Sequence, residues 1–176
     1  MNGLKLLGHP LHPAVVHFPV AGWTAAVATD VLFVSLGDPL WWQISRWLLA
    51  VGVLTALGAM TAGFVDLLAM PPGSPTQRRA LRHLYLMASA WTVYAIDLLL
   101  RFISPAPRPG PVLGWAVLSL SICGFVLLFA GTHVGAQLVY DLGVGQTGRG
   151  STLPGTATEE KAAGTSGAAR SSARAP

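Results

Sequence analysis

Residues 44–70 read ISRWLLAVGVLTALGAMTAGFVDLLAM, a continuous apolar run whose only charged members are Arg46 and Asp66. A helix needs about 20 predominantly apolar residues to cross the hydrocarbon core of a bilayer, and this run is longer than that. A helix of this composition would be hydrophobic all round, which is typical of a membrane span. The run therefore predicts a transmembrane helix.

Three further apolar blocks flank this run, over residues 18–36, 81–103 and 112–138. The whole chain agrees with them, because 52% of its residues are hydrophobic and only 10% are charged, whereas about a quarter of the residues of a soluble domain are charged. We therefore expect an integral membrane protein with four transmembrane helices, whose main partner is the lipid bilayer.

Proline-rich breaks separate the four blocks. They read Gly37-Asp38-Pro39, Pro71-Pro72-Gly73-Ser74-Pro75 and Ser104-Pro105-Ala106-Pro107. Proline interrupts the hydrogen-bond ladder of a helix, so each break should end one span. The short connections make consecutive spans antiparallel neighbours, and the predicted fold is an all-α, up-down bundle of four transmembrane helices.

The chain changes character after residue 146. Residues 147–176 are rich in Gly, Ala, Ser and Thr, and Leu153 is their only large aliphatic residue. Such a segment buries too little apolar surface to fold. The predicted organisation is a membrane domain over residues 1–146 and a disordered tail over residues 147–176.

Positive charges beside the spans indicate the orientation. An even number of spans puts both termini on one side, here called side A, and the connections after the first and third spans on the opposite side B. Side A carries Lys5, Arg78, Arg79, Arg82 and Arg149, and side B carries Arg46, Arg101 and Arg108. The positive-inside rule then places both termini in the cytoplasm. The net charge of +4 belongs to these flanks, so no nucleic-acid partner is expected.

Tryptophans mark the side B ends of the second and fourth spans. They are Trp41, Trp42, Trp47 and Trp115. Tryptophan is enriched at the membrane–water interface, so we expect all four to be interfacial anchors.

Five histidines are the most informative residues. The sequence GHPLHPAVVHFP, residues 8–19, contains His9, His12 and His17, and the other two are His83 and His133. At 1.5 Å of rise per residue, Asp66 and His133 each lie about 30 Å along their spans from the side B surface, which returns them to side A. His17, Asp66, His83 and His133 therefore reach one membrane level from four different helices, and we predict that they converge, with His9 or His12 folded over them as a lid.

Two kinds of cofactor fit such a set. Three histidines and a carboxylate could hold a transition-metal ion. Alternatively, two histidines on separate helices could be the axial ligands of a b-type haem. Gly63, Gly131 and Gly135 lie close to these residues in sequence and would let a flat porphyrin approach the backbone, although small residues also serve helix packing.

Three functions follow from these alternatives. The first is a redox or electron-transfer role with haem or a metal ion, the second is transport of metal ions or protons, and the third is a structural membrane subunit without a cofactor, whose histidines only hold the interface. The sequence lacks a nucleophile elbow, a zinc-protease helix and a phosphate-binding loop, so a stand-alone enzyme is not expected.

Side B has a polar set of its own. Asp97 and Arg101 stand four apart in the third span and can pair, and Asp30 could meet Arg46. Charges near the ends of spans usually extend towards water. We interpret this set as interfacial anchors that fix the register of the helices.

Several of these motifs occur together in one family. The doubled His-Pro of GHPLHPAVVHFP, the segment Gly63-Phe64-Val65-Asp66, the histidine that opens the third span and the closing Leu138-Val139-Tyr140 resemble the bacterial predicted membrane proteins called domain of unknown function 2231. The resemblance covers residues 8–146 and implies four spans. Some members are joined to Rieske or cytochrome-type domains, which implies an electron-transfer setting, and here the redox partner would be a separate protein.

Overall fold

The computed structural model describes residues 5–6, 9–103 and 109–144, and the side chains among them from Leu11 onward. Four long helices make up the described part: α2 (His17–Leu36), α3 (Pro39–Leu68), α4 (Pro75–Ile103) and α5 (Pro111–Tyr140). The strands β1 (Lys5–Leu6) and β2 (His9–Pro10) and the short helix α1 (Leu11–Val15) precede them. All four long helices are long and apolar enough to cross a membrane, which confirms the predicted spans. The predicted disordered tail lies outside the described residues.

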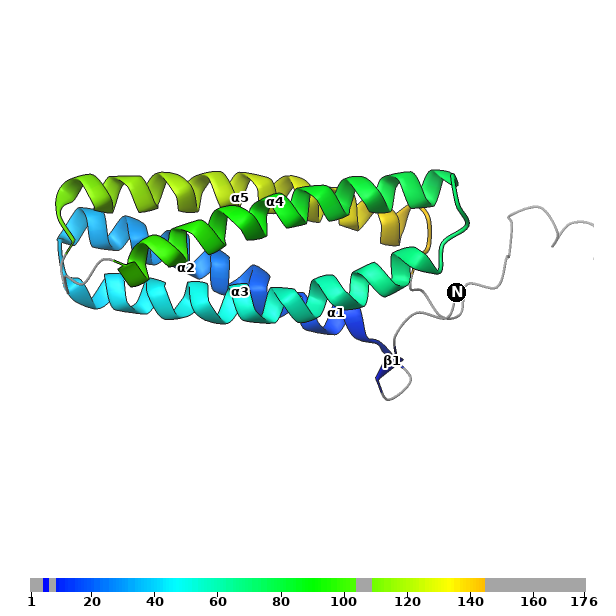
Figure 1. Cartoon of the computed structure of the whole chain (residues 1–176), viewed down its shortest axis with the longest axis horizontal. Coiled ribbons are helices and arrows are strands. Elements are labelled where there is room, and N and C mark those ends of the chain that lie inside the picture. Colours follow the sequence, from blue (N-terminus) through cyan, green and yellow to red (C-terminus); the bar gives the residue numbers. More distant parts are fainter. Residues whose placement is uncertain (1–4, 7–8, 104–108, 145–176) are drawn as a thin grey trace, which may run out of the picture. The chain divides into compact units, whose positions relative to one another are not determined.

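The helices are arranged as an up-down bundle. Each long helix packs against the next one in the chain, and α2 also packs against α5. Figure 1 shows the ends of α2 and α4 together with the starts of α3 and α5 at one end of the bundle, and α1 with the end of α5 at the other. The predicted antiparallel order of the spans is therefore confirmed.

Three prolines begin helices rather than only ending them. Pro39, Pro75 and Pro111 are each the first residue of their helix, where the missing N–H would have no partner inside the helix anyway. Before Pro39, Gly37 closes α2 in the left-handed conformation (φ 69°), and the Asp38 carboxylate caps α3 by accepting the Leu40 N–H at 2.9 Å. Helix α4, which contains the third span, begins at Pro75, before the apolar block that starts at residue 81. Its first turns are polar but still helical.

The outside of the bundle is apolar and the inside contains many small side chains. Leu54, Val126 and Phe129 are each more than 60% exposed, as expected of side chains that contact lipid. The central core cluster consists of Trp23, Ala26, Leu49, Val53, Ala56, Tyr94 and Leu128. Helices in lipid gain little from the hydrophobic effect when they associate, because the lipid is also apolar. Small residues let the helices approach closely, so that van der Waals packing holds them together.

The polar set of side B is buried in the bundle and not at its surface. Arg101 Nε donates to Asp97 Oδ1 at 2.9 Å, as predicted, but Asp30 pairs with Arg101 Nη2 at 2.7 Å and not with Arg46. The exposed fractions of these three residues are 0%, so the expectation of charges that extend to water was wrong for them. Arg46 instead donates to Gln43 at 2.6 Å.

Trp42 also departs from expectation. It is 1% exposed, and the Arg101 guanidinium carbon lies 4.7 Å from the centre of its ring. Trp42 therefore covers a buried cation, whereas Trp47 and Trp115 are exposed as interfacial anchors should be.

Candidate functional site

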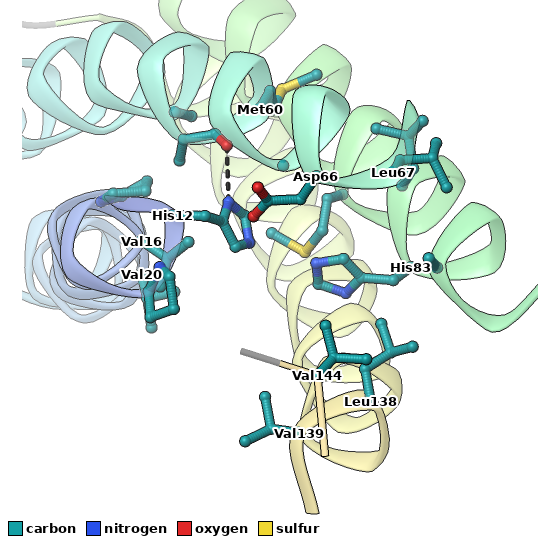
Figure 2. Close-up of a pocket in the computed structure, with 18 of the residues that line it drawn as sticks. His12, Val16, Val20, Met60, Asp66, Leu67, His83, Leu138, Val139 and Val144 are labelled. Carbon is teal, nitrogen blue, oxygen red and sulfur yellow. Dashed lines mark hydrogen bonds between the residues drawn. The ribbon is translucent and has the colours of Figure 1, made fainter. Parts of the chain in front are cut away.

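An apolar pocket near side A is lined by residues of α1 and of all four long helices. Its cavity volume is about 150 Å³. Its ionisable lining residues are His12, Asp66 and His83, and most of the remaining wall is aliphatic. Figure 2 shows both imidazole rings and the carboxylate directed into this pocket. A mostly apolar cavity with a few convergent polar groups is the usual form of a ligand site.

His12 enters the pocket from α1, which packs against α3. Just before it, β1 and β2 pair antiparallel, with Lys5 opposite Pro10 and Leu6 opposite His9. The His12 ring links α1 to α3, because its Nδ1 lies 2.8 Å from the carbonyl oxygen of Ala59 on α3. This hydrogen bond fixes the orientation of the ring.

His83 is held in the same way from the other side of the pocket. Its Nδ1 lies 2.8 Å from the carbonyl oxygen of Gly131 on α5. A carbonyl oxygen can only accept, so in both histidines Nδ1 carries the hydrogen. In the neutral ring, Nε2 is then left with its lone pair, which is the state that a metal ligand requires.

The two rings lie next to each other. Their centres are 6.4 Å apart and their planes are nearly perpendicular, at 89°. In Figure 2 the rings point towards each other from opposite walls, and the Asp66 carboxylate lies beside His12. The structure therefore brings together three of the residues singled out from the sequence, His12, His83 and Asp66.

Two glycines make room for these rings. A β-carbon at Gly63 would lie 3.0 Å from the His12 ring, and one at Gly135 would lie 2.9 Å from the His83 ring. Any larger side chain would therefore displace the imidazole. These glycines were expected to admit a porphyrin to the backbone, and they instead accommodate the histidines.

His17 and His133 do not join the pocket. Both are exposed; His17 Nδ1 lies 3.4 Å from the carbonyl oxygen of Ala14, and His133 Nε2 lies 3.2 Å from Gln137 Nε2. Within the described residues, no group of three His, Cys, Asp or Glu side chains could hold a metal ion. The predicted convergence of His17, Asp66, His83 and His133 was therefore wrong, because rise along a helix fixes depth but not the face on which a side chain lies.

The remaining residues of the predicted set have different outcomes. The side chain of His9 lies outside the described residues, so its predicted place in a lid stays a prediction. His12 was expected to cover the site and is one of its two central rings. The carbonyl groups of Ala59 and Gly131, which orient the rings, could not have been found from sequence, because every residue carries a carbonyl.

The family comparison agrees with this architecture. The chain belongs to the family described as predicted membrane protein (DUF2231), whose profile matches residues 8–148. No curated protein and no solved structure shows significant similarity to it. The matched range contains all the described residues of the pocket.

Proposed function

We propose that this member of the DUF2231 family binds a b-type haem between His12 and His83 and takes part in electron transfer within the membrane. The observation that carries the proposal is the pair of imidazole rings, each oriented by a 2.8 Å hydrogen bond from Nδ1 to a backbone carbonyl and each directed into an apolar pocket. When bound, haem supplies one-electron chemistry at its iron, and the protein sets its orientation and surroundings.

The separation of the rings suits a shared metal centre. Imidazole nitrogens bind first-row metal ions at about 2 Å, so the centres of two rings on opposite sides of one ion are about 6 Å apart. The observed 6.4 Å agrees with that value. The Nδ1 hydrogen bonds also match the usual arrangement of metal-bound histidine, in which the second nitrogen donates to a carbonyl or carboxylate.

Haem fits the donor set better than a bare metal ion does. A protein-bound transition-metal ion takes three or four protein ligands, and no such group exists among the residues described. Haem iron needs only axial ligands, because the porphyrin supplies the other four. The aliphatic walls, such as Val16, Val20, Leu67 and Leu138, suit a flat apolar macrocycle.

The cavity volume favours a second candidate ligand. A cavity of about 150 Å³ is the size that accepts a benzene-like ring, and a porphyrin would also have to occupy the open side of the pocket. A quinone head group is a single ring with two oxygen atoms, and its hydroxyl groups in the reduced form could donate to the two Nε2 atoms. With this ligand, His12 and His83 would again hold a redox-active group in the membrane.

Transport and purely structural roles receive less support. Part of the apolar core cluster lies between the pocket and side B, since Ala26 and Tyr94 come after the pocket residues and before Asp30 and Asp97 along their helices. A path for ions would need polar groups there. A structural subunit would have no use for two imidazole nitrogens that both face a cavity.

The visible spectrum of the purified protein tests the proposal. We expect an intense haem absorption band that is lost in His12→Gln and His83→Gln, because glutamine cannot replace Nε2 as an axial ligand. The matched controls are His17→Gln and His133→Gln, which should keep the full band because both residues are exposed outside the pocket. Quinone in an organic extract without the band would support the second candidate. Neither ligand, or equal loss in all four variants, would contradict the site.

The redox role also predicts a location and a partner. We propose that the chain lies in the bacterial inner membrane with both termini in the cytoplasm, and that a separate protein exchanges electrons with it. Arg101 is paired with two carboxyl groups and is therefore not a free positive charge on side B. This increases the excess of free positive charges on side A. Reporter fusions after Gly37 and in the tail should show opposite accessibility; equal accessibility would contradict the four-span topology.

A further inference from the structure

A second polar cluster lies near side B, away from the histidine pocket. Asp30 on α2, Asp97 and Arg101 on α4 and Ser121 on α5 all have exposed fractions of 0%. Arg101 makes a two-point contact with Asp97, through Nε to Oδ1 at 2.9 Å and Nη2 to Oδ2 at 3.3 Å, and Nη2 also reaches Asp30 Oδ2 at 2.7 Å. The cluster therefore joins three of the four spans.

The hydroxyl group of Ser121 reveals a shortage of hydrogens. Its oxygen lies 2.6 Å from Asp30 Oδ2 and 2.7 Å from Asp97 Oδ2. A hydroxyl group donates one hydrogen, and an ionised carboxylate only accepts. If both carboxyl groups were ionised, one of these short contacts would join two acceptors with no hydrogen between them. One more proton is needed to make both contacts hydrogen bonds.

The charge balance requires the same proton. Two carboxylates and one guanidinium sum to a net negative charge, which is very costly inside a transmembrane bundle. Among the described residues, the neighbouring polar groups offer no second cation: Tyr94 points its hydroxyl to the Ser121 carbonyl at 3.4 Å, and Ser45 and Thr29 contact the Ala26 carbonyl at 3.4 and 2.9 Å. On α3, Trp42 covers Arg101, and the Arg46 guanidinium is bound to Gln43.

We propose that the cluster is a proton-binding site in which Asp30 holds the proton. The Asp30 hydroxyl donates to Ser121 Oγ, Ser121 donates to Asp97 Oδ2, and Asp97 stays ionised against Arg101. The two-point contact with Arg101 favours Asp97 as the anion. Asp30 has one oxygen, Oδ1, that is buried without a hydrogen-bond partner among the described residues, and this costs less for a neutral carboxyl group than for a carboxylate.

The proton is exchanged with side B. The cluster lies closer to the side B ends of α2 and α4 than to their side A ends, since Asp30 and Asp97 each stand near the close of helices that end at Leu36 and Ile103. The apolar core cluster separates it from the histidine pocket. Arg101 Nη1 is also buried without a partner among the described residues, so the guanidinium keeps a donor available when the proton leaves.

Infrared difference spectroscopy of the purified protein tests this site. The carbonyl stretch of a protonated carboxyl group is separate from the bands of carboxylates, and the chain has only seven Asp and Glu residues. We expect one protonated carboxyl at neutral pH, lost in both Asp30→Asn and Asp97→Asn, because either change leaves one carboxylate to balance Arg101. Asp141→Asn, at a carboxylate that is 59% exposed, is the control and should keep the band. No band in the unmodified protein, or a band that survives both changes, would overturn the proposal.

Unfolding in detergent gives a second readout. Folding takes up one proton that the unfolded chain releases above the usual carboxyl range of about pH 4, so stability should fall as the pH rises. The unfolding equilibrium constant should rise about tenfold per pH unit until the folded cluster also loses its proton. In Asp30→Asn, the amide N–H₂ can donate to Ser121 in place of the carboxyl hydroxyl but cannot accept from Arg101 Nη2. The variant should therefore be somewhat less stable, and this pH dependence should disappear. An unchanged pH dependence in Asp30→Asn would contradict the assignment.

Discussion

The two ends of the bundle use polar residues in opposite ways. At side B, Asp30, Asp97 and Arg101 are fully buried and bonded to one another. At side A, His12 and His83 are half-buried, bond within the described residues to backbone carbonyls through Nδ1, and turn the rest of each ring into a cavity. Both ends are built from side chains of several spans.

This difference separates groups that hold the fold from groups that serve a ligand. A charge inside a membrane must be balanced at the moment of folding, so the side B residues find their partners within the chain. A neutral imidazole with one unbonded nitrogen at a cavity costs little free energy, so His12 and His83 can be folded before a ligand binds. Substitutions should therefore damage stability at side B and ligand content at side A.

Replacing the buried cation should have the largest effect. Arg101→Met keeps most of the side-chain volume but leaves the Asp97 carboxylate without a positive partner, which typically costs about 3–5 kcal/mol. His83→Gln at the other end should cost less than about 1 kcal/mol, since glutamine can still bond to the Gly131 carbonyl. Thermal unfolding of both variants in detergent measures the contrast. Equal losses at the two ends would break the distinction.

Filling the space beneath His12 should affect ligand binding before stability. Gly63→Val places a side chain where the His12 ring lies, because even a β-carbon there would be 3.0 Å away. Misplacing an oriented ligand side chain typically costs about 10- to 100-fold in affinity. Gly58→Val on the same helix is the control, since nothing lies within 4 Å of a β-carbon there. Haem titration should show weak binding only in the first variant; equal affinities would contradict the role of the ring.

Acid should act on the two ends in different ways. Protonation of Nε2 removes its lone pair, so bound haem should be released in acid, below the pH of about 6.5 at which free histidine gains its proton. The side B cluster already holds its proton there and should remain folded. Absorbance measures haem release, and circular dichroism measures helix content. Loss of helix before loss of haem would contradict this order.

An exposed ion pair gives the smallest effect. Arg79 and Asp141 are 3.4 Å apart, and their side chains are 38% and 59% exposed. Such pairs contribute less than about 1 kcal/mol and are screened by salt. Arg79→Ala should therefore lower the unfolding midpoint only slightly, and less so in high salt. A loss as large as that of Arg101→Met would show that burial is not what distinguishes the two pairs.

The fold could be predicted from the sequence because its signals are local. Composition and length determine the spans, and the proline-containing breaks determine where they turn back. The apolar block of the third span begins at residue 81, whereas helix α4 begins at Pro75, because apolar residues mark the membrane and not the helix, and Pro75 starts a helix in polar surroundings. The predicted pairing of Asp97 with Arg101 was also local, four residues apart on one helix.

The site could be predicted only in part because it depends on helix rotation. Counting residues gave the correct depth for His83 and Asp66, but one residue turns a helix by about 100°, so depth does not identify the inward face. His17 and His133 therefore looked equivalent to His83 and are exposed. Asp30 and Arg46 likewise lie at suitable depths for a pair, but depth alone did not reveal that Asp30 faces Arg101.

The aromatic core between the two ends has a consequence for how they communicate. Trp23 and Tyr94 are stacked with ring centres 4.6 Å apart, and β-carbons at Gly52 and Gly124 would lie 2.5 Å and 2.8 Å from these rings. Such a tightly filled layer resists rearrangement. It therefore limits the transfer of structural changes from one end to the other, and the free-energy effects of substitutions at the two ends should add.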